Sequence, residues 1–284
     1  MKNVQKFGKS AAIMAILSSA IIGGVATVSA DETIGGEYKS HSAIQFVPND
    51  DSTGPIDPTD PTEPIDPIDP IDPIDPIDPT EPIEPGTPGP LSIDFASSLN
   101  FGIQKITSTD EEYLAYSQPA KNAAGEVVYK PNYVQVTDNR GTAAGWNLSV
   151  TQTEDFKTTD DTAKNKTLPG ATISLNGATA VSAATGTASP EVKDLVLTPG
   201  QATEVITAAE NAGEGTWVSR FGNETDLADD TAALVEDANG EVVDGTINKN
   251  KQVKLAVPGK IAKSATEYKT DLVWTLSEVA PNGK

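Results

Sequence analysis

Three tryptophans are the side chains of this sequence whose chemistry is most informative. An exposed indole stacks on flat apolar ligands such as sugar rings, whereas a buried indole fills a large part of a core. Two of them occur in the pattern Trp-x-Leu, as Trp146-Asn147-Leu148 and Trp274-Thr275-Leu276. Alternate residues of a strand share one face, so Trp146 lies beside Leu148 and Trp274 beside Leu276. Two interpretations are open: core packing, which these apolar neighbours favour, and stacking on a glycan.

The third tryptophan, Trp217, lies in a glycine-rich stretch that runs from Gly215 to Gly222. The same two interpretations apply to it, and we expect it to lie closer to the surface than the other two. The candidate residues, either binding or fold-defining, are therefore Trp146, Leu148, Trp217, Trp274 and Leu276.

Side chains that perform acid–base or nucleophilic catalysis are scarce. The chain has one histidine, His41 in its N-terminal part, and no cysteine. A Ser-His-Asp triad, a Cys-His pair and a multi-histidine zinc site are thereby excluded from the C-terminal region. Two carboxylates suffice for glycoside hydrolysis, but the many acids of this chain are typical of solvated faces and turns. We expect no enzyme, no catalytic residue and no cofactor.

Clusters of acidic residues raise the question of a metal site. They are Asp160-Asp161, the group Asp226, Asp229 and Asp230, and Glu236-Asp237. None has the spacing of an EF-hand loop, so surface solvation is the preferred interpretation and no metal is predicted.

The N-terminus has the features of a secretion signal. Lys2, Lys6 and Lys9 precede an apolar stretch over residues 11–28, and Val28-Ser29-Ala30 is a small-residue cleavage site. A membrane anchor is the competing interpretation. Serine and glycine dilute the apolar stretch, and the acidic segment after Ala30 is no stop-transfer flank. We therefore predict cleavage of residues 1–30 and an exported mature chain that is not inserted in a membrane.

The net charge limits the possible partners. The whole chain carries −21, and the signal contains three lysines and no acid, so the mature chain carries −24. Such a charge repels nucleic acid and anionic lipid, and no basic patch offsets it. Nucleic acid is therefore not an expected partner.

Two segments precede the region in which β-branched and polar residues alternate as in a folded β domain. Residues 31–54 are predicted to be a flexible N-terminal segment. Residues 55–90 form an acidic, proline-rich linker in which Ile-Asp-Pro repeats without interruption over residues 65–79. Three residues per repeat match the three residues per turn of polyproline II, which favours a rod-like spacer. A disordered tether remains an equal alternative, and neither has a packed core.

Residues 91–284 differ sharply in composition. Short runs alternate between β-branched and polar residues, as in residues 132–137 and 252–257, and turn signals such as Asn176-Gly177 separate them. This pattern predicts an all-β domain, an antiparallel β-sandwich or barrel. Residues 226–237 are the best candidate for a helix.

The two Trp-x-Leu motifs and their surroundings resemble the WxL domain family of Gram-positive surface proteins. The resemblance extends over residues 136–146, 212–217, 253–259 and 268–276, and so covers nearly all of 91–284. It implies a C-terminal WxL domain that attaches to peptidoglycan or another cell-wall polymer without a covalent bond. It also implies assembly with other WxL proteins and with a membrane-anchored WxL-interacting protein.

These observations predict an exported protein of the Gram-positive cell surface that binds the cell wall through residues 91–284. The alternative function is an adhesin or complex subunit whose domain binds a host or partner protein, while another subunit contacts the wall. Nothing in the sequence decides which residues would touch a glycan.

Overall fold

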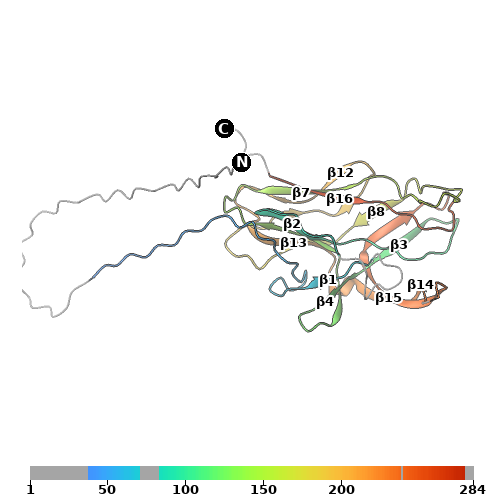
Figure 1. Ribbon diagram of the computed structural model, residues 1–284. Helices are drawn as coiled ribbons and strands as arrows, with labels where there is room; N and C mark the ends of the chain where they lie inside the picture. The colour runs from blue at the N-terminus through green and yellow to red at the C-terminus, as the bar shows by residue number, and fades with distance from the viewer. Residues whose placement is uncertain (1–37, 71–82, 238, 279–284) are drawn as a thin grey trace, which may run out of the picture. The chain divides into compact units, whose positions relative to one another are not determined.

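The computed structural model describes residues 38–70, 83–237 and 239–278 (Figure 1). The predicted signal over residues 1–30 lies outside the described residues. The chain divides into two units, residues 1–45 and 46–284. In the first unit, residues 38–45 are extended and exposed, and they include His41.

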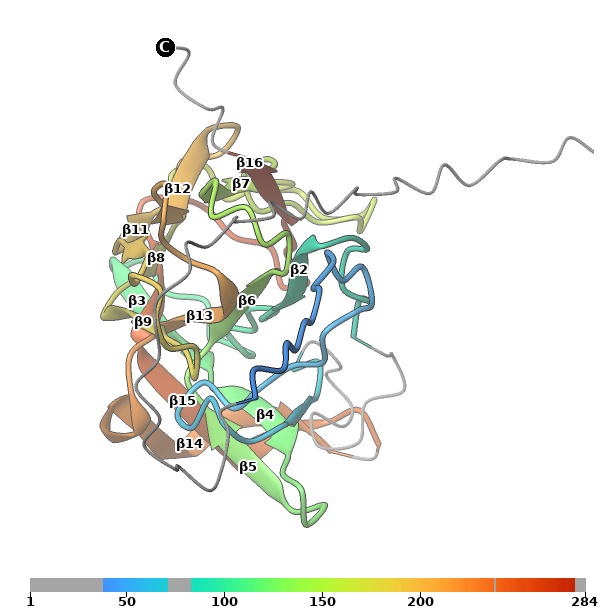
Figure 2. The ribbon, with the colours of Figure 1, turned by 90° about the vertical axis from the view of Figure 1, so that its left-hand side faces the viewer.

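The second unit is built from strands, and every pairing between its strands is antiparallel. Its one described helical element is a single 3-10 turn, η1 (Glu224–Asp226). The predicted all-β, antiparallel class is thus confirmed. The described strands pair into four open sheets, so a single sandwich or barrel is not confirmed (Figure 2).

The first two sheets have three and four strands. One has the order β1 (Asp66–Pro67), β4 (Gln118–Lys121) and β5 (Val127–Lys130). The other has the order β10 (Glu191–Val192), β12 (Ala202–Ala208), β7 (Trp146–Gln152) and β16 (Leu272–Glu278).

The remaining two sheets have five and four strands. The larger has the order β11 (Leu195–Val196), β8 (Thr172–Leu175), β15 (Val242–Val257) and β14 (Leu227–Glu236), and β3 (Glu111–Tyr116) pairs with β15. The smaller has the order β2 (Leu91–Ala96), β6 (Tyr133–Asp138), β13 (Gly215–Phe221) and β9 (Ala178–Val181).

The main core lies where three of these sheets face one another. On β7 the apolar residues Trp146, Leu148 and Val150 alternate with half-buried polar residues, so one face of the strand is buried and the other is not. On β6 every residue is buried, because Val134 and Val136 enter the main core while Tyr133 packs into a second cluster on the opposite face. The alternation of apolar and polar residues along these strands therefore determines which face of each strand lies in the core.

The helix predicted over residues 226–237 is wrong. Residues 227–236 form β14, which pairs with β15 over most of its length. Only the turn η1 precedes it, capped by Asn223, whose side chain accepts a hydrogen bond from the Thr225 N–H. The high alanine content favoured a helix, but pairing with β15 offers the backbone its hydrogen bonds and overrides that weak local preference.

A segment of the predicted linker belongs to the domain. Residues 54–70, here called the strap, run across the outer face of the β2-β6-β13 sheet and along β4 (Figure 2). Ile56 packs on the cluster of Phe95, Tyr133 and Val218. Ile65 and Ile68 are buried further along.

Hydrogen bonds and one ion pair hold the strap. The Gln135 amide donates to the Gly54 carbonyl at 3.0 Å and accepts from the Ile56 N–H at 2.8 Å. The Lys130 ammonium lies 2.7 Å from the Asp57 carboxylate, and both side chains are largely buried. Asp66 and Pro67 form β1, which pairs with Lys121 and Ala120 of β4.

The structure thus does not match a spacer or tether over residues 55–70. Isoleucine side chains are buried there, and buried side-chain amides form hydrogen bonds with the main chain of the strap. These contacts offset the conformational entropy that the segment loses when it becomes ordered. Residues 71–82 of the predicted linker lie outside the described residues.

Asp94 is a buried carboxylate beneath the strap. It accepts hydrogen bonds from the Ser92 hydroxyl at 2.7 Å, the Thr137 hydroxyl at 2.6 Å and the Gln135 amide at 2.9 Å. Burial raises the pKa of Asp94, and these hydrogen bonds offset only part of that effect. Because Gln135 also holds the strap, Asp94 is connected to the strap through one side chain.

The raised pKa predicts how Asp94 affects stability as the pH changes. A folded-state pKa above the unfolded value means that the folded state binds the proton more tightly, so the charged carboxylate destabilises the fold above its folded pKa. That penalty declines as the pH falls through the folded pKa toward the unfolded value of 3.8. The free energy of unfolding of the wild-type chain should therefore rise, relative to that of Asp94→Asn, as the pH is lowered from 7 to ~4.

Urea denaturation of both proteins across this pH range measures the difference. Asp57 is the matched control: burial alone would raise its pKa, but Lys130 and Thr59 outweigh burial and lower it. Relative to Asp57→Asn, the wild type should keep its stability down to pH ~4 and lose it only as the pH falls below the unfolded value of 3.8, so this pair is followed to lower pH. The same sign for both pairs would contradict the prediction.

Candidate functional site

The two Trp-x-Leu motifs lie side by side although more than a hundred residues separate them. Their strands β7 and β16 are antiparallel neighbours, with Leu276 opposite Leu148 and Trp274 opposite Val150 (Figure 1). The tryptophan and leucine of each motif point to the core side of this sheet. The middle residues, Asn147 and Thr275, point to the other side.

Trp146 is entirely buried, at 0% exposure. Its indole N–H donates a hydrogen bond of 2.9 Å to the Gly213 carbonyl. Gly213 has a φ of +72°, and a Cβ there would lie 2.9 Å from the indole nitrogen and 2.5 Å from the Ala208 Cβ. Glycine is therefore required where the chain passes the indole, and Trp146 is placed in the core together with Leu148.

Trp217 is also buried, with 6% of its surface exposed. Its indole N–H donates to the Glu214 carbonyl at 3.0 Å, and its ring belongs to the main core. Trp217 is thus slightly more exposed than Trp146, but the expectation that it lies closer to the surface than both other tryptophans is wrong, because Trp274 is more exposed. Its strand β13 pairs with β6 on one edge and with β9 on the other, so β13 is an interior strand of its sheet.

Trp274 differs from the other two tryptophans because it is only partly buried. Its strand β16 is at one end of the sheet order and has no partner beyond β7 among the described residues. Leu276 is likewise partly buried, and Val273 on the opposite face is 49% exposed. Of the five predicted site residues, Trp274 and Leu276 are therefore the two that reach the surface.

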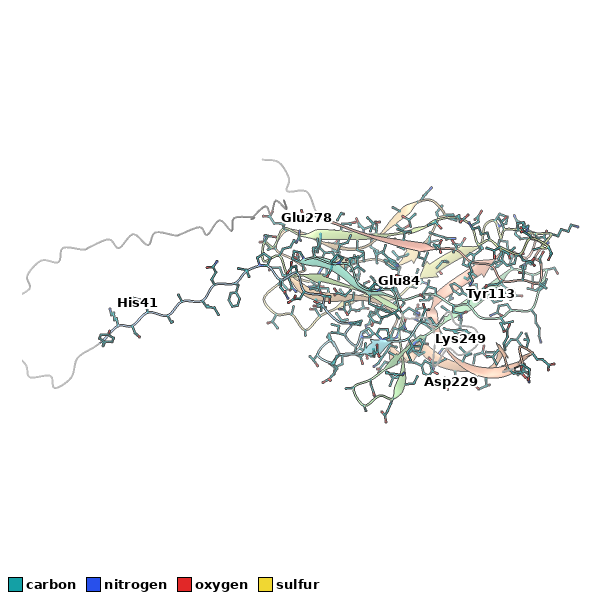
Figure 3. All side chains as sticks on the ribbon, viewed as in Figure 1. His41, Glu84, Tyr113, Asp229, Lys249 and Glu278 are labelled. Carbon is teal, nitrogen blue, oxygen red and sulfur yellow. The ribbon has the colours of Figure 1, made fainter. Side chains whose placement is uncertain are left out.

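Both residues line a groove with a volume of about 550 Å³. It lies between β16 and the chain that leads into β2, and Figure 3 labels Glu278 at one end of β16. The walls combine prolines, an indole and a few polar groups. The lining residues are Thr87, Pro88, Gly89, Pro90, Leu91, Ile93, Arg140, Trp274, Thr275, Leu276 and Glu278.

Arg140 is the buried cation of this groove. Its guanidinium donates two hydrogen bonds to the Asp138 carboxylate, at 2.9 and 2.8 Å, and one to the Gly145 carbonyl at 2.9 Å. It also donates to the exposed Glu278 carboxylate at 3.1 Å. The hydrogen bonds with Asp138 raise the pKa of Arg140, so it stays charged. Arg140 thereby joins the turn before β7 to the end of β16.

The groove can bind a ligand that has both flat apolar faces and hydroxyl or carboxylate groups. The Trp274 ring offers an apolar surface, and the Pro88 and Pro90 rings form a rigid wall. Glu278 is 68% exposed at its side chain and accepts hydrogen bonds. Asp138, Gly145 and Glu278 take four of the five N–H groups of Arg140, so Arg140 offers a ligand one fixed donor. Sugars carry this combination of surfaces.

A second groove of about 410 Å³ crosses β15 between β3 and β14. Tyr113, Asp229 and Lys249 line it, and Figure 3 shows them near one another. Its charges are largely paired within the chain, since Lys249 lies 2.8 Å from Asp230 and Asn248 donates to Asp229 at 2.8 Å. It contains no residue of the tryptophan motifs.

Metal sites and membrane-spanning helices are two further features to consider in the described part of the chain. No three acidic or histidine side chains gather there in a way that would hold a metal ion. Nor do those residues include a helix long and apolar enough to cross a membrane. The acidic clusters named from the sequence lie on exposed turns and on β14, where Asp230 pairs with Lys249.

The sequence analysis missed Arg140, Glu278 and the loop over residues 87–90. The loop was assigned to the linker, yet the Asn139 N–H donates to the Pro90 carbonyl at 2.6 Å and ties it to the domain. One signal was available: Asp138 and Arg140 are two residues apart at the end of a predicted strand, a spacing that allows an ion pair across a turn. Glu278 carries no such signal.

One comparison with known proteins identifies the family of this chain. A family model described as WxL domain, surface cell wall-binding, matches residues 33–280. Neither the curated proteins nor the solved structures contain a significant match to the chain. The matched region includes the strap as well as the strands, which agrees with the strap being part of the folded unit. The chain belongs to the WxL domain family of cell wall-binding surface proteins.

Proposed function

We propose that this protein attaches non-covalently to the peptidoglycan of a Gram-positive cell wall and that the groove beside Trp274 makes the contact. Family membership supports wall binding in general. The observation that supports the groove is that Trp274 alone among the three tryptophans is partly exposed, and it lines a cavity with Arg140 and Glu278. A sugar ring stacks on the indole while these charged groups meet its hydroxyls.

No catalysis is part of this proposal. His41 lies in the extended segment over residues 38–45, and the family is defined by binding. The groove holds its substrate by shape and hydrogen bonds, and the protein's function is to remain on the wall.

Replacing Trp274 by alanine tests the groove directly. Loss of the stacking surface should weaken binding to purified peptidoglycan about tenfold, which corresponds to about 1.4 kcal/mol. Co-sedimentation of the mature chain with sugar-cleaned peptidoglycan measures the bound fraction. The matched control is Val273→Ala, on the same strand but on its opposite face.

Val273→Ala should bind like the wild type. Urea unfolding of both variants checks that each is folded. Equal binding of Trp274→Ala and Val273→Ala would reject the groove as the wall contact while leaving family membership untouched.

A complex with other WxL proteins and a membrane-anchored WxL-interacting protein is part of the proposal as well. The same co-sedimentation experiment examines this point. Retention of the purified chain supports direct wall binding. Retention only after the membrane-anchored protein is added supports the alternative, in which a partner subunit contacts the wall.

Salt dependence follows from the charge. The chain carries −21, and anionic wall polymers repel it over long range, so attachment depends on short-range stacking and hydrogen bonds. Raising NaCl from about 0.05 to about 0.5 M screens the repulsion and should leave the bound fraction unchanged or higher. A steep loss of binding over this range would show that charge attraction, and not the groove, holds the protein.

A further inference from the structure

At two of the three Ile-Asp-Pro triplets in the strap, a buried glutamine of the domain forms hydrogen bonds with the main chain. At the first, Gln135 accepts from the Ile56 N–H, and its amide donates to the Gly54 carbonyl. At the second, the Ile68 N–H donates to the Pro119 carbonyl at 2.9 Å, and the Gln118 amide donates to the Ile68 carbonyl at 2.6 Å. Gln118 and Gln135 are both fully buried. In each case a buried glutamine recognises the main chain at the isoleucine.

The second position is a site for the repeat itself, here called the repeat site: Asn100, Gln118, Pro119, Ala120 and Lys121. Besides the bonds to Ile68, the Asn100 amide donates to the Pro70 carbonyl at 2.6 Å. Ile65 and Ile68 are buried, at 7% and 6% exposure. These contacts involve main-chain groups and isoleucine side chains, which recur in each triplet.

The sequence contains more of these triplets than the repeat site holds. Ile-Asp-Pro occurs five times in succession over residues 65–79, and the first two occupy the site. The remaining triplets present the same isoleucines, prolines and main-chain groups. A pair of triplets from any point in the tract therefore offers the same contacts.

We propose that the repeat site also accepts the Ile-Asp-Pro tract of a second copy of this chain, so that neighbouring molecules become linked. The contacts within one molecule and between two molecules are the same, as in domain swapping. The chain's own tract has the advantage of an effective concentration in the millimolar range. Confinement of many copies on one surface raises the concentration of competing tracts.

The exchange requires only a local release. Residues 65–70 leave the repeat site, which breaks the pairing with β4 and the hydrogen bonds from Gln118 and Asn100. The first part of the strap stays in place, because Gln135 holds residues 54–56 and Lys130 holds Asp57. The folded unit therefore persists while its tract is exchanged.

Cysteine cross-linking of the mature chain tests this proposal, and the absence of native cysteines makes any disulfide diagnostic. Asp66 and Lys121 are opposite each other in the β1–β4 pair, and both are exposed. Opposed positions in an antiparallel pair have Cα atoms about 4.5–5.5 Å apart, which is within the range that disulfides span. The double variant Asp66→Cys/Lys121→Cys should close within one molecule and verifies the docked strap.

The decisive experiment mixes two single variants at about millimolar concentration, where tracts in cis and in trans compete. The donor is Asp66→Cys or Asp75→Cys, which have the same position in the triplet, and the acceptor carries Lys121→Cys. A third variant, Lys260→Cys, provides an exposed lysine position outside the repeat site.

Oxidised mixtures of donor and Lys121→Cys should contain on the order of tenfold more disulfide heterodimer than donor mixed with Lys260→Cys. An excess of a synthetic peptide of four Ile-Asp-Pro triplets should suppress that heterodimer. Heterodimer at the level of the Lys260→Cys control, with the double variant closed internally, would show that the site is used only within one molecule. Failure of the double variant to close would overturn the docked strap and the proposal with it.

Discussion

A chain that begins at Leu91 is expected to be less stable than the mature chain by about 3–6 kcal/mol, from the loss of two buried isoleucines at about 1.5–3 kcal/mol each. Ile65 and Ile68 are buried where the strap runs along β4, and the strap also supplies the Asp57 partner of Lys130. Removing the strap exposes the Phe95, Tyr133 and Val218 cluster to water. Urea unfolding followed by tryptophan fluorescence measures the loss.

Two controls separate the strap from the rest of the N-terminal region. A chain that begins at Phe46 lacks the first unit but keeps the strap, and it should match the mature chain in stability. Ile68→Ala should account for a large share of the loss, whereas Ile44→Ala, at a residue 79% exposed, should be neutral. Equal midpoints for the chains beginning at Leu91 and Phe46 would show that the strap does not stabilise the domain.

Replacement of Trp146 by alanine should lower the free energy of unfolding by about 3–5 kcal/mol. The ring is entirely buried and packs among strands of different sheets, so its removal leaves a cavity that the rigid strands cannot close. The Gly213 carbonyl also loses its donor. Chemical denaturation and near-UV circular dichroism measure the loss of stability and of fixed packing.

A second substitution at this position separates packing from hydrogen bonding. Trp146→Phe keeps most of the apolar volume but removes the indole N–H, so it should cost about 1–3 kcal/mol through the unpaired carbonyl of Gly213. Trp274→Ala should cost less than Trp146→Ala, because Trp274 is only partly buried. If Trp274→Ala proved the more damaging to stability, the division between a core tryptophan and a groove tryptophan would be wrong.

Apolar residues at every second position of the sequence determined which segments are strands and which face of each strand is buried. Strict alternation in Trp146, Leu148 and Val150 placed these residues on one face, and the structure puts that face in the core. Turn signals such as Asn176-Gly177 mark real breaks between strands: Gly177 lies between β8 and β9 and has a φ of +66°. Local chemistry of this kind is visible in one sequence because it depends only on neighbouring residues.

The sequence did not show in the same way which segments of the chain contact one another. The alanine content of residues 227–236 predicted a helix, but in the structure this segment pairs with β15 as a strand. The proline-rich tract predicted a linker, but its first part is bound by hydrogen bonds from Gln118 and Gln135. The partner of residues 227–236 is the next strand along the chain, beyond a short turn, whereas Gln118 and Gln135 lie 50 and 79 residues from the isoleucines that they bind. Neither partner can be read from the residues of the segment itself.

The sequence by itself determined the all-β class, the family and the face of the strand on which each motif residue lies. Only the tertiary structure decided which tryptophan reaches the surface, because exposure depends on what covers a strand. Trp146 and Trp217 lie on strands paired on both sides, whereas Trp274 lies on β16, at the end of its sheet. Two copies of one motif therefore have different environments, since strand order is set by contacts between residues far apart in the chain.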